Sequence, residues 1–374
     1  MLFILAFFLV YLGMHCFTWA RFAAQFEFSS RVRRGGFLLC LLLALSPIAA
    51  HIIPLSWPES LVYIIWQVVF TWLGVIFYLF LLQLALFVLQ LMVWPVRVRI
   101  SPGLSRAAAF AIITVTILTV GWGFMEAAGP VRVTEYEISS PKIGNDLRVV
   151  FLSDTHLGVQ KSMQRVKDLK SLVHDQDPDL IILGGDILND HLEWLQEEAR
   201  IMQGMQAGLG KYAVLGNHEF YAGADDSRDF FARAGFTLLE DETEKLSETN
   251  IEIIGVSDPA PHGRFRQHQE NVTKQLTRRL DPDKYNILVS HRPWGFEIAR
   301  DAGVDLHLAG HTHKGQIFPF RFFVRLKYDH VYGIRRSNDS SLIVTSGAGS
   351  WGPPIRVLAP PEIVLVKISP GVSV

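Results

Sequence analysis

Cysteine is nearly absent from this 374-residue sequence: only Cys16 and Cys40 occur, both in apolar stretches near the start. The later part of the chain can therefore hold neither a disulfide framework nor a zinc site built on thiolates. Lysine and aspartate are absent from residues 1–130, which contain seven arginines and three glutamates. Since the whole chain has 35 basic and 36 acidic residues, 28 basic and 33 acidic residues remain for the later part. Such an acidic balance argues against a nucleic-acid partner, which requires a basic surface.

This change in composition near Pro130 predicts two domains, residues 1–130 and residues 131–374. The first contains four apolar stretches, at about 2–20, 36–53, 61–94 and 107–128. Because a spanning helix needs roughly 20 apolar residues, we predict a four-helix transmembrane region, with the long third stretch forming one tilted helix. The first stretch lacks the basic start and the small-residue cleavage site of a signal peptide, so a retained anchor is favoured over a cleaved leader.

Arginines between these stretches predict the orientation. The loop 21–35 carries four arginines, the loop 95–106 carries three, and the loop 54–60 carries only Glu59. The positive-inside rule places arginine-rich loops in the cytoplasm. We therefore expect an integral, multi-pass protein of the cell membrane whose second domain lies on the non-cytoplasmic side. A re-entrant third stretch would reverse this expectation.

The second domain alternates short β-rich runs with helical patterns. The informative β-rich runs are 147–154, 179–186, 211–218, 285–291 and 304–311. The helical candidates between them are about 163–175, 191–207, 226–234 and 294–302. This alternation predicts a layered α/β fold. Two later β-rich runs, 341–347 and 362–368, are expected to complete a second sheet.

All five runs end in a side chain that binds metals, or place one just beyond: Asp154 and His156; Asp186; Asn217 and His218; His291; His311 and His313. Ligands in layered α/β proteins gather beyond the carboxyl ends of strands, so we expect these side chains to converge. Residues two apart on an extended segment point to the same side, so Asp154 and His156 can face one ion. Asn217 and His218 are adjacent, and we expect different roles for them.

Seven of these residues are candidate ligands, with three oxygen donors and four imidazoles: Asp154, His156, Asp186, Asn217, His291, His311 and His313. Seven ligands exceed what one ion with an open position accepts, and they suit two ions that share a bridging carboxylate. Oxygen and imidazole ligation without thiolate favours Mn, Fe, Zn or Co. Two ions about 3.5–4 Å apart form the arrangement used for attack on phosphorus.

In their order along the chain, these residues resemble the motifs of the calcineurin-like metallophosphoesterases. The family pattern D-x-H, G-D, G-N-H-[DE], H and G-H-x-H reads here as "SDTHLG", "GGDILND", "GNHEF", "SHRPW" and "GHTHKGQI". The resemblance covers about residues 147–368 and implies a four-layer α/β/β/α sandwich. The tail "GSWGPPIRVLAPPEIVLVKI" resembles the branch of the superfamily that carries membrane anchors and faces outward.

The resemblance divides the ligands between two ions: Asp154, His156 and His313 at the first, Asn217, His291 and His311 at the second, and Asp186 bridging both. It makes His218 the general acid for the leaving-group oxygen, oriented by Glu219. Lys314 stands where close relatives have glycine, and it could hold an anionic substrate or point to solvent. Arg292 is a second candidate for substrate contact, and further candidates are Tyr221, Trp351 and Arg356.

These features predict a membrane-anchored phosphoesterase that hydrolyses a phosphodiester or phosphomonoester with metal-activated water. Anchoring in the bilayer suggests a lipid or lipid-linked substrate. A phosphatase or nucleotide phosphodiesterase acting on soluble substrates is an open alternative. A catalytically inactive membrane sensor or scaffold is disfavoured, because no ligand and no acid is missing from the motifs. We expect the lipid bilayer and a phosphorylated substrate as partners, and we predict no protein partner.

Overall fold

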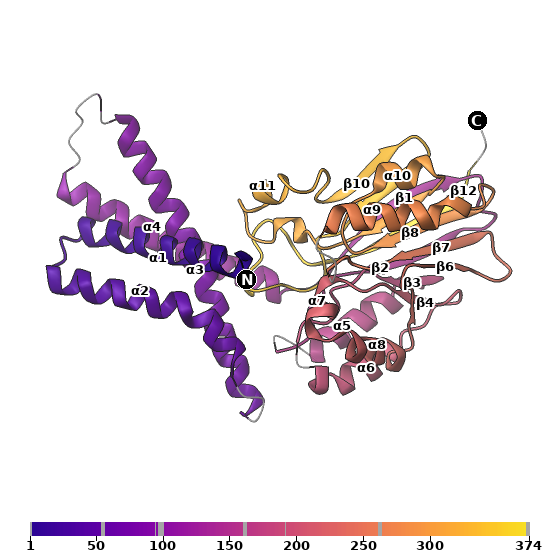
Figure 1. The fold of residues 1–374 in the computed structure, drawn as a ribbon, viewed down its shortest axis with the longest axis horizontal. Helices are drawn as coiled ribbons and strands as arrows, with labels where there is room; N and C mark the ends of the chain where they lie inside the picture. The colour runs from indigo at the N-terminus through magenta and orange to yellow at the C-terminus, as the bar shows by residue number, and fades with distance from the viewer. Residues whose placement is uncertain are drawn as a thin grey trace. The chain divides into compact units, whose positions relative to one another are not determined.

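The computed structural model describes residues 2–53, 57–93, 95, 101–159, 163–190, 192–260 and 264–371 (Figure 1). The chain divides into two compact units. One is Met1–Met125 with Gly352–Ile355, and the other is Glu126–Trp351 with Arg356–Val374.

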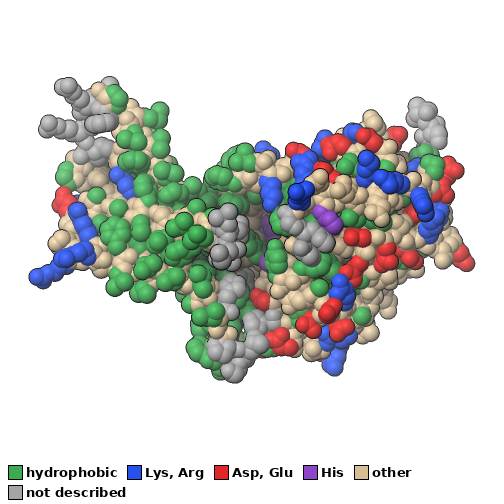
Figure 2. Space-filling model, in the orientation of Figure 1, with side chains coloured by type: hydrophobic (Ala, Val, Ile, Leu, Met, Phe, Trp, Pro, Cys, Tyr) green, Lys and Arg blue, Asp and Glu red, His purple; other side chains and the backbone are tan. Residues whose placement is uncertain are grey.

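Four long helices begin the chain: α1 (Leu2–Gln25), α2 (Ser30–His51), α3 (Glu59–Val93) and α4 (Pro102–Ala128). All four are long and apolar enough to cross a membrane. Large apolar side chains such as Leu38, Val68 and Leu118 are exposed on them, and hydrophobic side chains cover much of the surface of these helices in Figure 2. Helices that are apolar on every side are typical of membrane spans. The third apolar stretch forms one continuous helix of 35 residues.

The helices extend further than the apolar stretches, so the predicted arginine loop 21–35 is much shorter in the structure. Arg21 lies within α1, and Arg31, Arg33 and Arg34 lie in the first turns of α2. Arginine is a good helix former, which explains why these helices continue past their apolar residues. In the second predicted loop, Arg106 lies within α4, whereas Arg97 and Arg99 lie outside the described residues. In the loop 54–60, Glu59 begins α3, and residues 54–56 also lie outside the described part.

Two six-stranded sheets form the second unit. The first sheet consists, in spatial order, of β1 (Arg132–Ser140), β12 (Glu362–Pro370), β2 (Leu147–Leu152), β3 (Leu180–Leu183), β4 (Lys211–Ala213) and β5 (Thr237–Leu238). The second consists of β10 (Gly333–Ser337), β11 (Ser340–Val344), β9 (Leu306–Ala309), β8 (Tyr285–Ser290), β7 (Ile251–Val256) and β6 (Glu242–Lys245). Strands β2 to β5 run parallel to one another, and so do β7, β8, β9 and β11.

Side chains alternate between the two faces of each strand and thereby build separate cores. Phe151 of β2 lies in the core between the two sheets, together with Ile287 of β8 and Leu308 of β9. Its neighbour Leu152 lies in the core that β2 and β3 share with α5 (Met163–His174), α6 (Gln196–Gln203) and α8 (Ala224–Arg233). The second sheet has its own outer core with α9 (Phe265–Leu276) and α10 (Phe296–Asp301). The predicted four-layer α/β/β/α sandwich is confirmed.

One predicted strand belongs to the other sheet. The run 362–368 was expected to complete the second sheet, but β12 lies between β1 and β2 of the first. Val364 and Val366 point into the core between the sheets, while Ile363 and Leu365 point into the core under the helices. A strand that is apolar on both faces requires cover on both sides, and the interior of the first sheet provides it.

Candidate metal centre

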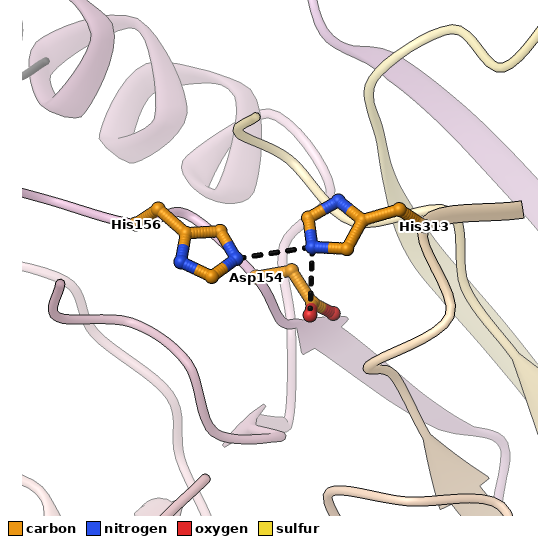
Figure 3. Close-up of side chains that lie close together, drawn as sticks. All are labelled: Asp154, His156 and His313. Atoms are coloured by element: carbon orange, nitrogen blue, oxygen red, sulfur yellow. Dashed lines mark hydrogen bonds and ion pairs between the residues drawn. The ribbon is translucent and has the colours of Figure 1, made fainter. Parts of the chain in front are cut away.

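The predicted ligands follow β2, β3, β4, β8 and β9, and the structure brings all of them except Asn217 into two groups. A third set, His156, Asp186 and His218, shares one member with each of these two groups. The first group is Asp154, His156 and His313 (Figure 3). Nε2 of His156 lies 3.0 Å from Nε2 of His313, which lies 3.3 Å from Oδ1 of Asp154. All three side chains are buried.

Asp186, His291 and His311 form the second group. Nε2 of His291 lies 3.1 Å from Oδ2 of Asp186 and 3.1 Å from Nδ1 of His311. His291 is fully buried, and its Nδ1 lies 2.8 Å from the carbonyl oxygen of Gly184. That contact fixes the ring and leaves Nε2 directed at the carboxylate.

Asp186 connects the two groups through a single oxygen. Its Oδ2, 3.1 Å from His291, is also 4.0 Å from Nε2 of His156. Its Oδ1 accepts the backbone N–H of His218 at 2.9 Å. A Cβ atom at Gly216 would collide with this Oδ1, so only glycine allows the two segments to approach so closely.

The backbone at the ligands is not extended, contrary to the reasoning from spacing. Left-handed φ angles occur at five of them: Asp154 (57°), His156 (50°), Asp186 (51°), His311 (69°) and His313 (48°). This conformation costs about 1–2 kcal/mol for a residue with a Cβ atom, and such strain gathers at functional sites. Asp154 and His156 share one group, whereas His311 and His313 contribute to different groups.

Burial and the nearby carboxylates shift the pKa values of the four candidate histidine ligands. Burial lowers the pKa of His156, His311 and His313 well below the usual 6.5, so each is neutral at pH 7 and keeps a free lone pair. Burial alone would also lower the pKa of His291, but Asp186 and Asp154 outweigh it and raise the value to about 10. The two buried carboxylates therefore demand compensating positive charge.

These residues fit divalent cations. When zinc binds nitrogen and oxygen at about 2.0–2.2 Å, neighbouring ligand atoms lie roughly 3 Å apart. The closest candidate ligand atoms within each of the two groups are separated by 3.0–3.3 Å, which agrees with this spacing. Imidazole and carboxylate donors without thiolate suit Zn, Mn, Fe or Co. The described residues thus provide His/Asp clusters that can hold metal ions.

Asn217 begins α7 (Asn217–Ala222), and its Oδ1 accepts from Nη2 of Arg292 at 3.2 Å. Arg292 is only 5% exposed and pairs with Asp258, whose Oδ2 is 2.5 Å from Nε. The structure therefore places Arg292 in a buried ion pair with Asp258 and in contact with the predicted ligand Asn217. Contact of Arg292 with substrate stays a prediction. Sequence reasoning missed Asp258, although it follows β7 as the ligands follow their strands.

His218 lies beside the carboxylate of Asp186, which connects the two groups. Its Nε2 is 4.0 Å from Oδ2 of Asp186, and 13% of its side chain is exposed. Its ring centroid lies 5.5 Å from that of Tyr221 and 6.0 Å from that of Trp351, and both aromatic side chains are exposed. His218 thus combines proximity to both groups with access to solvent.

Glu219, the residue expected to orient His218, contacts the backbone around the site. Its buried carboxylate accepts three backbone N–H groups, from Gly216 at 2.7 Å and from Asp186 and Leu188 at 2.9 Å each. Glu219 thereby ties the turn before α7 to the segment that carries Asp186, because a buried carboxylate can satisfy several backbone donors at once. Its expected role in orienting His218 stays a prediction.

Two further cations lie close to the first group. Nζ of the half-buried Lys314 lies 3.9 Å from the ring centroid of Tyr332, and its contact with substrate stays a prediction. Arg356, a candidate for substrate contact, is completely buried. It donates to backbone carbonyls, including that of Ser346, and its Nη2 lies 3.2 Å from Nδ1 of His313. Arg356 therefore links the backbone of Ser346 to the ring of His313.

Comparison with known proteins agrees with this geometry. Residues 147–315 match the family described as calcineurin-like phosphoesterase. A protein of Aquifex aeolicus (strain VF5) named as an uncharacterized metallophosphoesterase is 34% identical over 243 residues, which are 63% of this chain and 91% of that protein. The chain belongs to the calcineurin-like metallophosphoesterases.

Other relatives of this metallophosphoesterase are named as membrane proteins. A Danio rerio protein named "transmembrane protein with metallophosphoesterase domain" is 29% identical over 282 residues, 72% of this chain and 64% of that protein. Together with the four apolar helices, this relative indicates a membrane protein. Among solved structures, a Thermus thermophilus protein is similar with a TM-score of 0.39 and 12% identity, over 55% of this chain and 89% of that one.

Proposed function

We propose that this metallophosphoesterase hydrolyses phosphate esters with two divalent cations. Asp154, His156 and His313 would hold the first, and Asn217, His291 and His311 would hold the second. The observation that carries the proposal is the position of Oδ2 of Asp186, 3.1 Å from Nε2 of His291 and 4.0 Å from Nε2 of His156. One oxygen within reach of both groups is what a bridging carboxylate requires.

When bound, two such cations supply Lewis acidity that activates water and neutralises charge on the phosphoryl oxygens. The protein side chains supply the proton. Burial lowers the pKa of His218, which makes its protonated ring a stronger acid towards a departing alkoxide. The hydrogen bond from its backbone N–H to Oδ1 of Asp186 fixes the backbone of His218 beside this carboxylate, and Nε2 of its ring lies 4.0 Å from Oδ2.

The full-length protein in detergent is expected to hydrolyse bis-p-nitrophenyl phosphate only with divalent metal. Treatment with EDTA should abolish turnover, and adding Mn, Fe, Zn or Co should restore it. Release of p-nitrophenolate, measured by absorbance, checks the expectation. Turnover that persists in EDTA, or no turnover with any of the four metals, would contradict the proposal.

We also propose that the catalytic unit faces the non-cytoplasmic side and acts on a lipid or lipid-linked phosphate ester. Support for this orientation comes from the four arginines at the connected ends of α1 and α2, which favour a cytoplasmic position for that end. An impermeant maleimide on intact cells should label a Lys245→Cys variant that carries Cys16→Ser and Cys40→Ser. Labelling only after the cells are opened would reverse the orientation.

A further inference from the structure

Residues 318–327, which follow the metal centre and include α11 (Arg321–Val324), expose an unusual number of apolar side chains. Phe320 is 44% exposed, Phe322 50%, Phe323 56% and Leu326 85%. Four exposed apolar side chains within seven residues form the kind of apolar patch that marks a surface for a protein or membrane partner.

The same segment is strongly basic. It contains Arg321, Arg325 and Lys327, and no acidic residue occurs between His313 and Asp329. In the described part of the chain, no carboxylate pairs with Arg325 or Lys327, and both are exposed. Nζ of Lys327 lies 5.7 Å from the ring centroids of Trp294 and Tyr328. Phenylalanines beside basic side chains that have no carboxylate partner are typical of segments that lie in the interface of anionic membranes. We call residues 318–327 the aromatic–basic segment.

This segment packs directly on the turn that carries a predicted ligand. His313 and Lys314 belong to the short helix η4 (His313–Gly315), and a Cβ atom at Gly315 would collide with the Cα of Arg321. Gly315 has a φ of 81°, so glycine is required here for its backbone as well as for its size. Anything that covers α11 therefore lies close to the metal centre.

Two more exposed apolar side chains adjoin the start of the segment. Gln316 accepts the backbone N–H of Trp351 at 2.9 Å and donates to its carbonyl at 2.8 Å, which holds Trp351 beside the segment. Ile317 forms a bridge with Val357, the neighbour of Leu358. Trp351 is 54% exposed and Leu358 49%. Since Trp351 also borders His218, the apolar surface reaches from the segment to the predicted general acid.

A bilayer is the surface that can most readily cover the aromatic–basic segment, because the short connection between α4 and β1 keeps the second unit close to it. Only residues 129–131 separate α4 from β1, and even fully extended they span about 10 Å. Arg165 of α5 donates to the carbonyl oxygens of Ala127 and Gly129, so the catalytic unit binds the end of this connection. A unit tied this closely to a membrane span meets headgroups at far higher local concentration than any soluble partner.

We propose that the aromatic–basic segment inserts into the interface of an anionic bilayer and presents lipid phosphate esters to the metal centre. The phenylalanines and Leu326 enter the boundary between headgroups and acyl chains, while Arg325 and Lys327 contact lipid phosphates. The assignment of lipid phosphate esters as substrates rests on the proposed phosphoesterase function, whereas the docking surface does not.

Docking is tested with an environment-sensitive fluorophore on Leu326→Cys in the full chain, with Cys16→Ser and Cys40→Ser. The protein is placed in nanodiscs of phosphatidylglycerol and phosphatidylcholine that contain a lipid with a doxyl quencher near its headgroup. The label at position 326 should be quenched at least twofold more than the same label on Lys245→Cys. Phe322→Ser with Phe323→Ser should remove most of the difference. Arg325→Glu with Lys327→Glu should reduce it most at low salt, since salt screens the charges.

Equal quenching at positions 326 and 245 would overturn the docking surface. A fluorescence change that appears without lipid and rises with protein concentration would assign the surface to a second copy of the chain, which also overturns it. Arg278→Glu with Arg279→Glu, which reverses two exposed charges elsewhere, serves as the control and should leave the quenching unchanged.

Activity separates the docking surface from the proposed function. Phe322→Ser with Phe323→Ser should leave hydrolysis of bis-p-nitrophenyl phosphate within about twofold, and should lower headgroup release from phospholipid in nanodiscs by at least tenfold. Equal loss on both substrates would overturn lipid presentation by the segment. Quenching without hydrolysis of either substrate would support the docking surface and contradict the proposed function instead.

Discussion

Replacing Asp186 by asparagine is expected to lower turnover by at least about 10³-fold and to lower the metal content of the protein. Asparagine has the same shape but no negative charge, so one oxygen can no longer serve two cations. The nearby histidines stay in place, but the buried site loses half of its carboxylate charge. Turnover with bis-p-nitrophenyl phosphate and metal analysis of the same preparation measure the two effects.

The matched control for this change is Asp179→Asn. Asp179 precedes β3 and Asp186 follows it, so the two aspartates mark opposite ends of one strand. Oδ2 of Asp179 accepts the backbone N–H of Arg148 and lies apart from the metal-binding groups. This variant should keep both metal content and turnover. If Asp186→Asn kept them as well, a bridging role for Asp186 would be wrong.

Replacing His218 by asparagine is expected to lower kcat by about 10²–10⁴-fold on esters with alkyl leaving groups, while the metals are retained. An alkoxide leaves poorly without a proton, whereas p-nitrophenolate leaves readily, so the loss should be much smaller on bis-p-nitrophenyl phosphate. Comparing the two substrates therefore measures acid catalysis separately from damage to the site. His174→Asn, at an exposed position in the last turn of α5, is the control.

Metal content decides between two roles for His218. Its Nε2 lies 4.0 Å from Oδ2 of Asp186, the same distance as Nε2 of the predicted ligand His156. If His218→Asn loses metal, and loses activity equally on both substrates, then His218 is a ligand and the assigned general acid is wrong.

The clustering of Asp and His side chains at the candidate metal centre could be predicted from the sequence, because each of these residues follows a strand. Parallel strands end at one edge of a sheet, so the order of ligands along the chain defines their convergence in space. Asp258 follows the same rule after β7, but that strand was not among the predicted runs. β1 was also missed, because Glu135 and Glu137 alternate with half-buried residues and give it a weak apolar pattern.

The contacts of the charged residues could not be predicted in this way. The partners of Arg292 and Glu219 depend on segments that meet only in the folded protein, such as Asp258 and the backbone of Leu188. Complete burial of Arg356 is equally invisible to composition, since arginine is usually exposed. Left-handed backbone at the ligands also escaped the reasoning from spacing, which assumed extended segments.

The number of metal ions bound to each chain tests the shared carboxylate most directly. Elemental analysis of the purified full-length protein, after incubation with Mn, Fe, Zn or Co and removal of free metal, is expected to give about two ions per chain for at least one of these metals. The same analysis of Asp186→Asn should give fewer than two. One ion or none in the unsubstituted protein with every metal, or two ions unaffected by Asp186→Asn, would contradict a binuclear centre bridged by Asp186.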